Sequence, residues 1–207
     1  MAYIGNKPAN KAIVASDLDP AVITGQTALA TSPADTDEFL ISDAGTLKRI
    51  DASLVGGGGI TVADQWRLTA NFTSNADITS NLERIDTSPQ GVLGSMSESS
   101  GIFTFPSTGY YWVLFSVNGQ SDNGGGTVGG HIKATANNSS YSTVATGQYG
   151  ASDGRAQSFT ISSLIDVTDT SNVKVKFTAS SVSNSDELYG SSTENLTCMT
   201  FIRIGDT

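Results

Sequence analysis

Three places in the sequence carry side chains whose types could support chemistry. His131 follows Gly129-Gly130 at the start of an expected strand, and a histidine general base would need a nucleophile and an orienting acid beside it. Cys198 alternates in phase with apolar residues, which favours a buried thiol that packs as a small hydrophobe. The adjacent Asp186-Glu187 could serve glycoside hydrolysis, but adjacency in one loop does not set the separation of the carboxylates. A solvated turn is the simpler interpretation, so we expect no enzyme and assign no catalytic residue.

The same inspection finds no set of residues for a cofactor. One histidine and one cysteine cannot complete a zinc site within one chain. The glycine run 124–130 lacks the Lys-[Ser/Thr] pair and the helix of a phosphate-binding loop. Acidic loop positions such as Asp122 and Asp169 form no dense calcium-binding pattern. We therefore expect no cofactor and leave metal unassigned.

The charge balance limits the partners of this chain. Its 207 residues include 11 Lys+Arg and 20 Asp+Glu, for a net charge of −9 and a pI near 4.3. Neutralising the phosphates of nucleic acid or of an anionic membrane requires a basic surface, so neither is an expected partner. No apolar run approaches the length of a membrane span, and the opening residues show no apolar leader.

Residues 1–55 predict a small N-terminal segment. Residues 1–12 look extended, and two short apolar runs, 38–42 and 47–51, flank the loop 43–46 as in a β-hairpin. One hairpin is marginally stable in water, so it needs a partner: the second domain, a symmetry mate or another protein. The candidate attachment residues are Tyr3, Ile4, Phe39, Ile41, Leu47 and Ile50.

A glycine-rich linker, residues 56–61, is expected to separate this segment from a second domain, residues 62–207. Four consecutive glycines have no side chains to pack; the alternative is a glycine-lined close approach inside one domain. Downstream, short apolar runs separated by turn residues predict one antiparallel sandwich of eight to ten strands. The expected strands are 64–69, 78–86, 101–106, 109–119, 128–135, 141–147, 156–167, 172–179 and 195–204.

Two of these strands are apolar on both faces. Residues 110–117 place Tyr111, Val113 and Phe115 on one face, and Tyr110 and Trp112 on the other. A two-layer sandwich buries one face of each sheet, so a second apolar face predicts a subunit interface, unless loops or the N-terminal segment cover it. The candidate interface or core residues are Tyr110, Tyr111, Trp112, Phe115, Met199 and Phe201.

Polar segments with aromatic residues are candidates for receptor binding. Aromatic rings stack on sugar rings, and Asn and Ser side chains supply hydrogen bonds. The candidate receptor-loop residues are Tyr141, Tyr149, Arg155 and Tyr189. An ordinary polar loop is the alternative at each position.

The stretch GIFTFPSTGYYWVLF, residues 101–115, resembles the C1q/TNF-like jelly roll. In that family, Phe-x-x-Pro-x-x-Gly precedes a strand that reads Tyr-x-Val-x-Phe, and the closing strand 198–205 is also similar. The resemblance covers residues 62–207, consists mostly of core positions and implies a compact homotrimer around a threefold axis. The expected fold is therefore all-β, a C1q/TNF-like jelly-roll sandwich after a small extended and hairpin segment.

Other segments resemble structural proteins of marine tailed phages, cyanophages among them. These are MAYIGN (1–6), DEFLISD (37–43), NLERID (81–86), ESSGIFTFP (98–106) and TCMTF (197–201). The resemblance implies a non-enzymatic protein of the virion surface, either a head decoration or a tail-fibre component. Its expected partners are a homotrimer, other capsid or tail proteins, and a host surface glycan or protein. A free C1q-like lectin or protein-binding module is the alternative; a secreted animal protein would normally add a leader and a collagenous tract, and we see neither.

Overall fold

The computed structural model describes residues 27, 31, 33–34, 36–55, 59–121, 127–150, 155–182 and 186–207, without the side chain of Leu47. Tyr3, Ile4 and residues 56–58 of the linker lie outside the described residues. The chain divides into two compact units, Met1–Gly57 and Gly58–Thr207. We describe each unit by itself.

The first unit contains a β-hairpin, as predicted. Strands β1 (Glu38–Asp43) and β2 (Thr46–Asp51) pair antiparallel as sheet A. Ala44 and Gly45 form the turn, with φ of 49° and 83°. Two successive residues with positive φ match the twist of a tight hairpin, and Ala-Gly supplies a small residue and a glycine there. A one-turn helix, α2 (Ala52–Val55), follows β2 and was not expected.

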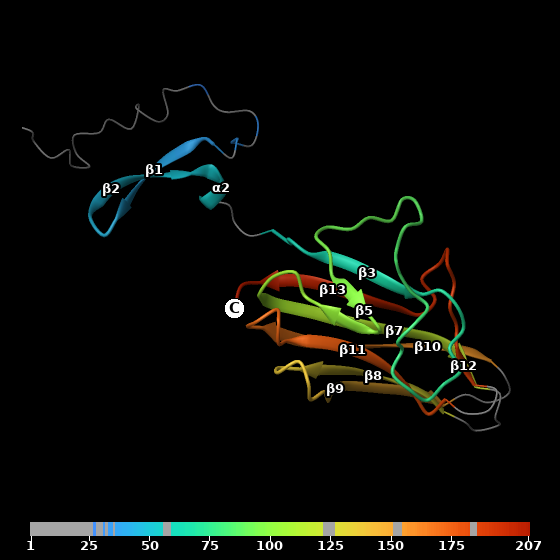
Figure 1. The fold of residues 1–207 in the computed structure, drawn as a ribbon. Coiled ribbons are helices and arrows are strands. Elements are labelled where there is room, and N and C mark those ends of the chain that lie inside the picture. Colours follow the sequence, from blue (N-terminus) through green and yellow to red (C-terminus); the bar gives the residue numbers. More distant parts are fainter. Residues whose placement is uncertain are drawn as a thin grey trace, which may run out of the picture. The chain divides into compact units, whose positions relative to one another are not determined.

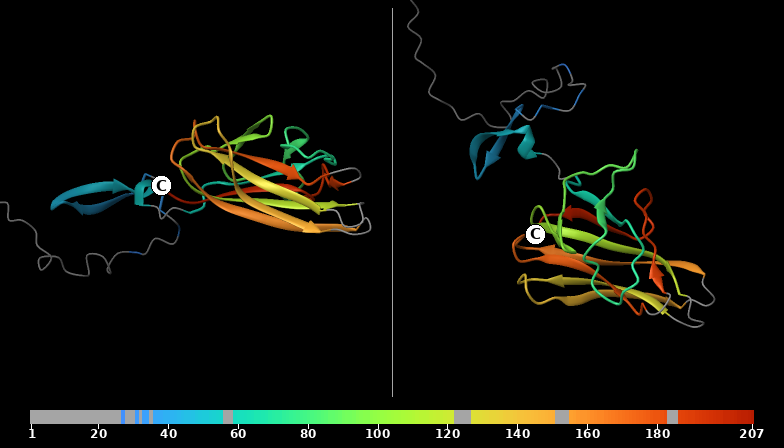
Figure 2. Two further views of the ribbon diagram at one scale, coloured as in Figure 1. Left: turned by 90° about the horizontal axis from the view of Figure 1, so that it is seen from below. Right: turned by 45° about the vertical axis from the view of Figure 1, so that its right-hand side comes forward.

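The second unit, which we call the sandwich, consists of two antiparallel sheets that face each other (Figures 1 and 2). Sheet B contains, in order, β10 (Ala156–Val167), β7 (Gly109–Gln120), β13 (Cys198–Gly205), β3 (Ala63–Leu68) and β4 (Leu82–Arg84), with β12 (Glu187–Leu188) beside β7. Sheet C contains, in order, β5 (Ser97–Ser99), β6 (Ile102–Thr104), β11 (Lys174–Ser180), β8 (Thr127–Thr135) and β9 (Ser142–Gly150). The predicted all-β sandwich is therefore confirmed.

Alternation along the strands explains which side chains enter the core. In β7, Tyr111, Val113 and Phe115 are fully buried, whereas Tyr110 and Trp112 point outward. In β11, Val175 and Phe177 point inward, and the lysines on either side of Val175 point outward. Both patterns follow the period of two that the sequence shows.

Aromatic rings fill the space between the two sheets. Phe103 and Phe177 of sheet C lie with ring centroids 5.4 Å apart, and Phe103 lies 5.0 Å from Phe201 of sheet B. The hydroxyl of Tyr111 donates to the carbonyl of Ser107 at 3.1 Å, so this buried tyrosine is satisfied. Contacts between aromatic side chains of opposite sheets fix how the sheets face each other.

The segment after β3 departs from the prediction. Only Leu82–Arg84 forms a strand within the expected 78–86. The side chain of Arg84 forms an ion pair with the buried carboxylate of Asp64, 3.1 Å from Nε to Oδ1. The Met96 amide donates to the same carboxylate at 2.8 Å. Side-chain hydrogen bonds therefore hold this connection where the sequence suggested a longer strand.

Candidate functional site

The residues whose types could do chemistry lie far apart. Cys198 is in β13 opposite Ser116, in phase with the outward residues of sheet B, and is buried. His131 is in β8 opposite Thr178, on the outer side of sheet C. The core separates the two side chains, whereas a nucleophile and its base must be within about 3 Å. The structure does not bring them together.

Electrostatics at these two residues agree with structural roles. Burial raises the pKa of the Cys198 thiol above its ordinary value, against the opposite effect of a hydrogen bond with Ser116. Burial, together with the nearby Lys133, lowers the pKa of His131, so the imidazole is neutral at pH 7. A thiol held in its neutral form is a poor nucleophile. The prediction that Cys198 is buried is confirmed.

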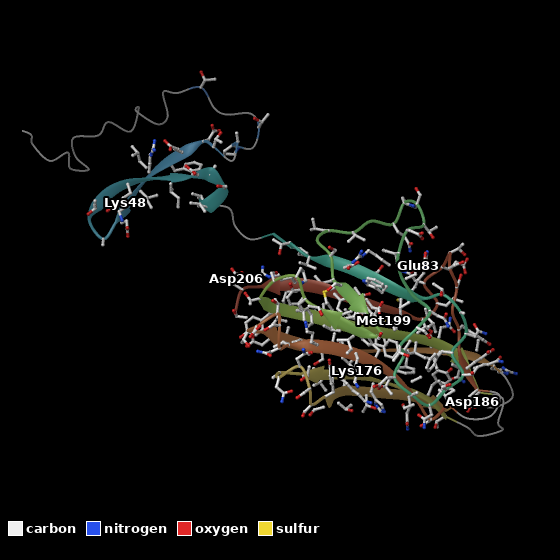
Figure 3. All side chains as sticks on the ribbon, in the orientation of Figure 1. Lys48, Glu83, Lys176, Asp186, Met199 and Asp206 are labelled. Atoms are coloured by element: carbon white, nitrogen blue, oxygen red, sulfur yellow. The ribbon has the colours of Figure 1, made fainter. Side chains whose placement is uncertain are left out.

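The expected solvated turn at Asp186-Glu187 is wrong for Asp186. This aspartate is fully buried, and Glu187 is half-buried in β12. Burial, with Tyr189 and Asp186 close by, raises the pKa of the Tyr149 hydroxyl to about 12. Figure 3 labels Asp186 at the end of the sandwich where β11 and β12 are joined.

The four candidate receptor residues do not form one surface. Tyr141 precedes β9 and Tyr149 lies near its other end, so strand rise alone separates them by about 26 Å. The loop placement expected for Tyr149 is wrong, because it lies in β9, is only 8% exposed and packs on Phe159. Tyr189 is half-buried and donates from Oη to Gln120 at 2.6 Å. Arg155 is the exposed member of the group.

The six candidate interface residues separate into two groups. Four are fully buried between the sheets and belong to the core: Tyr111, Phe115, Met199 and Phe201. Tyr110 and Trp112 point out of sheet B and are 37% and 46% exposed. Figure 3 labels Met199 within the sandwich. The core and the outer face of β7 are thus distinct surfaces, as the alternation in the sequence predicted.

Trp112 lies at the centre of what we call the apolar face, on the outer side of sheet B. In register, Trp112 is flanked by Leu164 of β10 and Ile202 of β13. Leu164 is 58% exposed, and Ile204 further along β13 is 56% exposed. The apolar face consists of Tyr110, Trp112, Leu114, Leu164, Ile202 and Ile204.

The apolar face is bounded by polar side chains further along the same strands and on the neighbouring β3. Ser116 and Thr160 exchange a hydrogen bond at 2.9 Å, and Gln65 donates to Thr200 at 2.8 Å. An exposed apolar area bordered by polar residues is typical of a protein–protein contact. Sequence reasoning missed Leu164, although it is the sole large apolar residue among the outward positions of β10.

A groove of about 460 Å³ opens beside the apolar face. Its walls come from the β8–β9 turn, the start of β9 and the end of β10, and its rim includes the exposed Val144 and Leu164. Asp166 supplies a carboxylate, and Ser140 and Thr168 supply hydroxyls. The mixture of apolar and polar lining could accommodate a small polar ligand.

The hairpin unit has exposed apolar residues of its own. Leu40 and Leu54 are 75% and 72% exposed, and the candidate attachment residues Phe39 and Ile41 are 41% and 37% exposed. Ile50, opposite Phe39 in register, is half-buried. Leu47 lies in β2, and its side chain is outside the described part.

The described residues contain neither a metal-binding cluster nor a membrane-spanning helix. Among them, no group of three or more His, Cys, Asp or Glu side chains is arranged to hold a metal ion. No helix within the described ranges is long and apolar enough to cross a membrane.

Comparison with solved structures identifies the type of fold. Murine APRIL is 12% identical, with a TM-score of 0.53, and the match covers 69% of this chain and 99% of that chain. The Eiger TNF of S. frugiperda is 10% identical, with a TM-score of 0.53, over 70% and 94% of the two chains. The globular domain of zebrafish complement 1qA is 15% identical over 71% and 99%, with a TM-score of 0.49.

The sandwich is therefore a jelly roll of the C1q/TNF type, and it accounts for about 70% of the chain. At these identities the likeness concerns the fold. No family model matches the chain, and no curated protein matches it.

Proposed function

We propose that this chain is a non-enzymatic structural protein of a tailed-phage virion. It forms a short homotrimeric appendage on the virion surface, as a head decoration or a tail-fibre component. The N-terminal segment docks on other virion proteins, and the sandwich faces outward toward the host surface. The phage-like segments in the sequence, from the opening MAYIGN to TCMTF near the C-terminus, support the virion context.

The apolar face carries the homotrimeric part of this proposal. The sandwich already has a complete aromatic core, so Trp112, Leu164 and Ile204 remain exposed for a purpose other than folding. Burying apolar area releases about 25 cal/mol per Å², so the neighbouring subunits of a ring-shaped oligomer would be a favourable cover for this face. The homotrimer implied by the C1q/TNF resemblance has a suitable surface here.

The hairpin supports docking by the N-terminal segment. Four of its charged side chains pair within the hairpin, Arg49 with Glu38 and Lys48 with Asp43. Its apolar side chains Phe39, Leu40 and Ile41 are exposed, and none of the described residues covers them. A partner surface on the virion would cover them.

A free lectin or protein-binding module is the alternative. The groove between the β8–β9 turn and β10 favours it, since hydroxyls, Asp166 and an apolar rim are suited to a sugar. Such a module would bind its ligand without residues 1–55, so the two functions predict different effects of a deletion.

Deleting residues 1–55 tests the proposal directly. The shortened protein should keep the oligomeric state of the full chain, because the apolar face is intact, but should no longer incorporate into particles. Light scattering measures the first property, and quantitative mass spectrometry of purified virions measures the second. Incorporation at the level of the full chain would overturn the docking role.

A further inference from the structure

The outer side of sheet C has an unusual concentration of positive charge for an acidic protein. All three lysines of residues 59–207 are Lys133, Lys174 and Lys176, and all three lie there. Lys133 and Lys176 are directly opposite each other in the β8–β11 register, and Lys174 is opposite Thr135. We call these three residues the lysine face; Figure 3 labels Lys176 on β11.

Acidic residues do little to neutralise this face. Within the strands of sheet C the acidic residue is Glu98, which pairs in register with the inward Phe103 and accepts from the Gly101 amide. Asp77 lies in the connection between β3 and β4, and its carboxylate contacts two of the lysines, at 3.0 Å from Lys133 Nζ and 2.6 Å from Lys176 Nζ. One carboxylate against two ammonium groups leaves an excess positive charge.

Lys174 adds a second uncompensated charge. Its Nζ donates to Thr104 Oγ1 at 2.9 Å and to the carbonyl of Thr170 at 3.0 Å, both neutral acceptors. Among the described residues, no carboxylate lies within ion-pair distance of Lys174. Three of the four arginines of residues 59–207, by contrast, are each paired with a carboxylate: Arg67, Arg84 and Arg203.

The lysines are held in place before any ligand arrives. Like charges directly opposite each other in a sheet are destabilising, so the Lys133–Lys176 pair depends on Asp77 between them. Lys176 also lies over the ring of Tyr141, 4.4 Å from its centroid. Ordered side chains lose less conformational entropy when they bind.

We propose that the lysine face binds anionic oligosaccharides, with Lys133, Lys174 and Lys176 contacting the carboxylates of acidic sugars. The hydroxyls around the lysines suit sugar hydroxyl groups, and Lys174 and Lys176 are about 7 Å apart along β11, a spacing compatible with charges on neighbouring sugar units. Nucleic acid fits less well, because neutralising its successive phosphates requires a longer basic surface than these three lysines provide. The proposal extends the host-facing part of the proposed function.

Titration calorimetry of the full chain with a galacturonic acid hexamer tests this proposal, with maltohexaose as the neutral control. We expect binding of the acidic hexamer alone, weakened about fivefold or more between about 20 and about 200 mM NaCl. Equal binding of both hexamers, no binding of the acidic one at low salt, or preferential binding of a single-stranded DNA oligomer would overturn it.

Matched variants locate the site. Lys174→Gln removes a charge without leaving a carboxylate unpaired, and should weaken binding about three- to tenfold, whereas Lys174→Arg should stay within about twofold of the wild type. Lys48→Gln makes the same change in net charge in the hairpin unit, where the ammonium group of Lys48 pairs with Asp43, and should leave binding unchanged. A larger loss in Arg155→Gln than in Lys174→Gln would place binding at the loops and overturn the lysine face. Because the purified protein is used, failure here leaves the incorporation test of the proposed function unaffected.

Discussion

Asp77, in the connection between β3 and β4, forms ion pairs with two lysines of sheet C. Its carboxylate accepts hydrogen bonds from Lys133, Lys176 and Thr178. Burial alone would raise its pKa, but the hydrogen bonds from Lys176, Thr178 and Lys133 outweigh burial and hold the pKa well below the ordinary value of 3.8. The carboxylate is therefore ionised in the folded protein throughout the physiological range.

Asp77→Asn should lower the free energy of unfolding at pH 7 by about 2 kcal/mol, because it removes the charge from these hydrogen bonds. Because the pKa of Asp77 is lower in the folded than in the unfolded protein, its carboxylate stabilises the fold at pH values above the unfolded-state pKa. This stabilisation is lost as the pH falls toward the folded-state pKa. The difference between wild type and variant should therefore shrink below about pH 4. Urea unfolding at pH 7, 5 and 3, at one protein concentration, measures it.

Asp206→Asn is the matched control for this experiment, since the Asp206 side chain is 90% exposed in its pair with Arg203. It should have little effect at any of these pH values. A pH-independent difference for Asp77→Asn would contradict the electrostatic role of Asp77.

The elements differ in how far the sequence predicts them. Strand β11 alternates polar and apolar residues, and β7 has apolar residues on both of its faces. The existence of these strands and the direction of their side chains therefore follow from the period of two. Strand β5 reads Ser-Glu-Ser and carries no such signal; its pairing with β6 depends on contacts in three dimensions. Helix α2 is a single turn, too short for a periodic pattern.

The same limit applies to the candidate surfaces. Trp112 was identifiable from its own strand, but its flanking by Leu164 depends on the β7–β10 register, which one sequence does not specify. Asp77 lies 56 residues before Lys133, and no local pattern predicts that the two meet. Tyr149 lies beyond the expected strand 141–147, whereas β9 extends to Gly150, and the burial of Tyr149 in β9 is a tertiary effect.

The hairpin of β1 and β2 is the element that should respond most to assembly. An isolated two-stranded sheet is marginally stable, and Phe39, Leu40 and Ile41 are exposed. We expect the amides of residues 38–51 to exchange rapidly in the free protein and slowly on the particle. Hydrogen exchange with mass spectrometry compares the two states, and strands of sheet B provide the internal control. Equal protection of 38–51 in both states would show that the hairpin needs no partner.

The whole sandwich has two opposite outer surfaces of different chemistry. Sheet B presents the apolar face around Trp112, and sheet C presents the lysine face around Lys174. An apolar surface gains from being covered, whereas ammonium groups lose hydration when they are buried. Assembly through sheet B would therefore leave sheet C in contact with solvent and with ligands.

Substitutions on the two sides of sheet B should separate assembly from folding. Trp112→Glu places a charge on the apolar face, where it should abolish self-association and leave the fold intact. Phe201→Asp places a charge in the core and should cost about 3–5 kcal/mol or prevent folding. Circular dichroism and thermal unfolding distinguish the two effects.

Multi-angle light scattering of the purified full chain tests the trimer most directly. The wild type should have a mass of three times the 21.4 kDa of one chain, and Trp112→Glu should have the mass of one folded chain. A wild-type mass of 21.4 kDa would show that the apolar face does not mediate self-association and would contradict the proposed homotrimeric appendage.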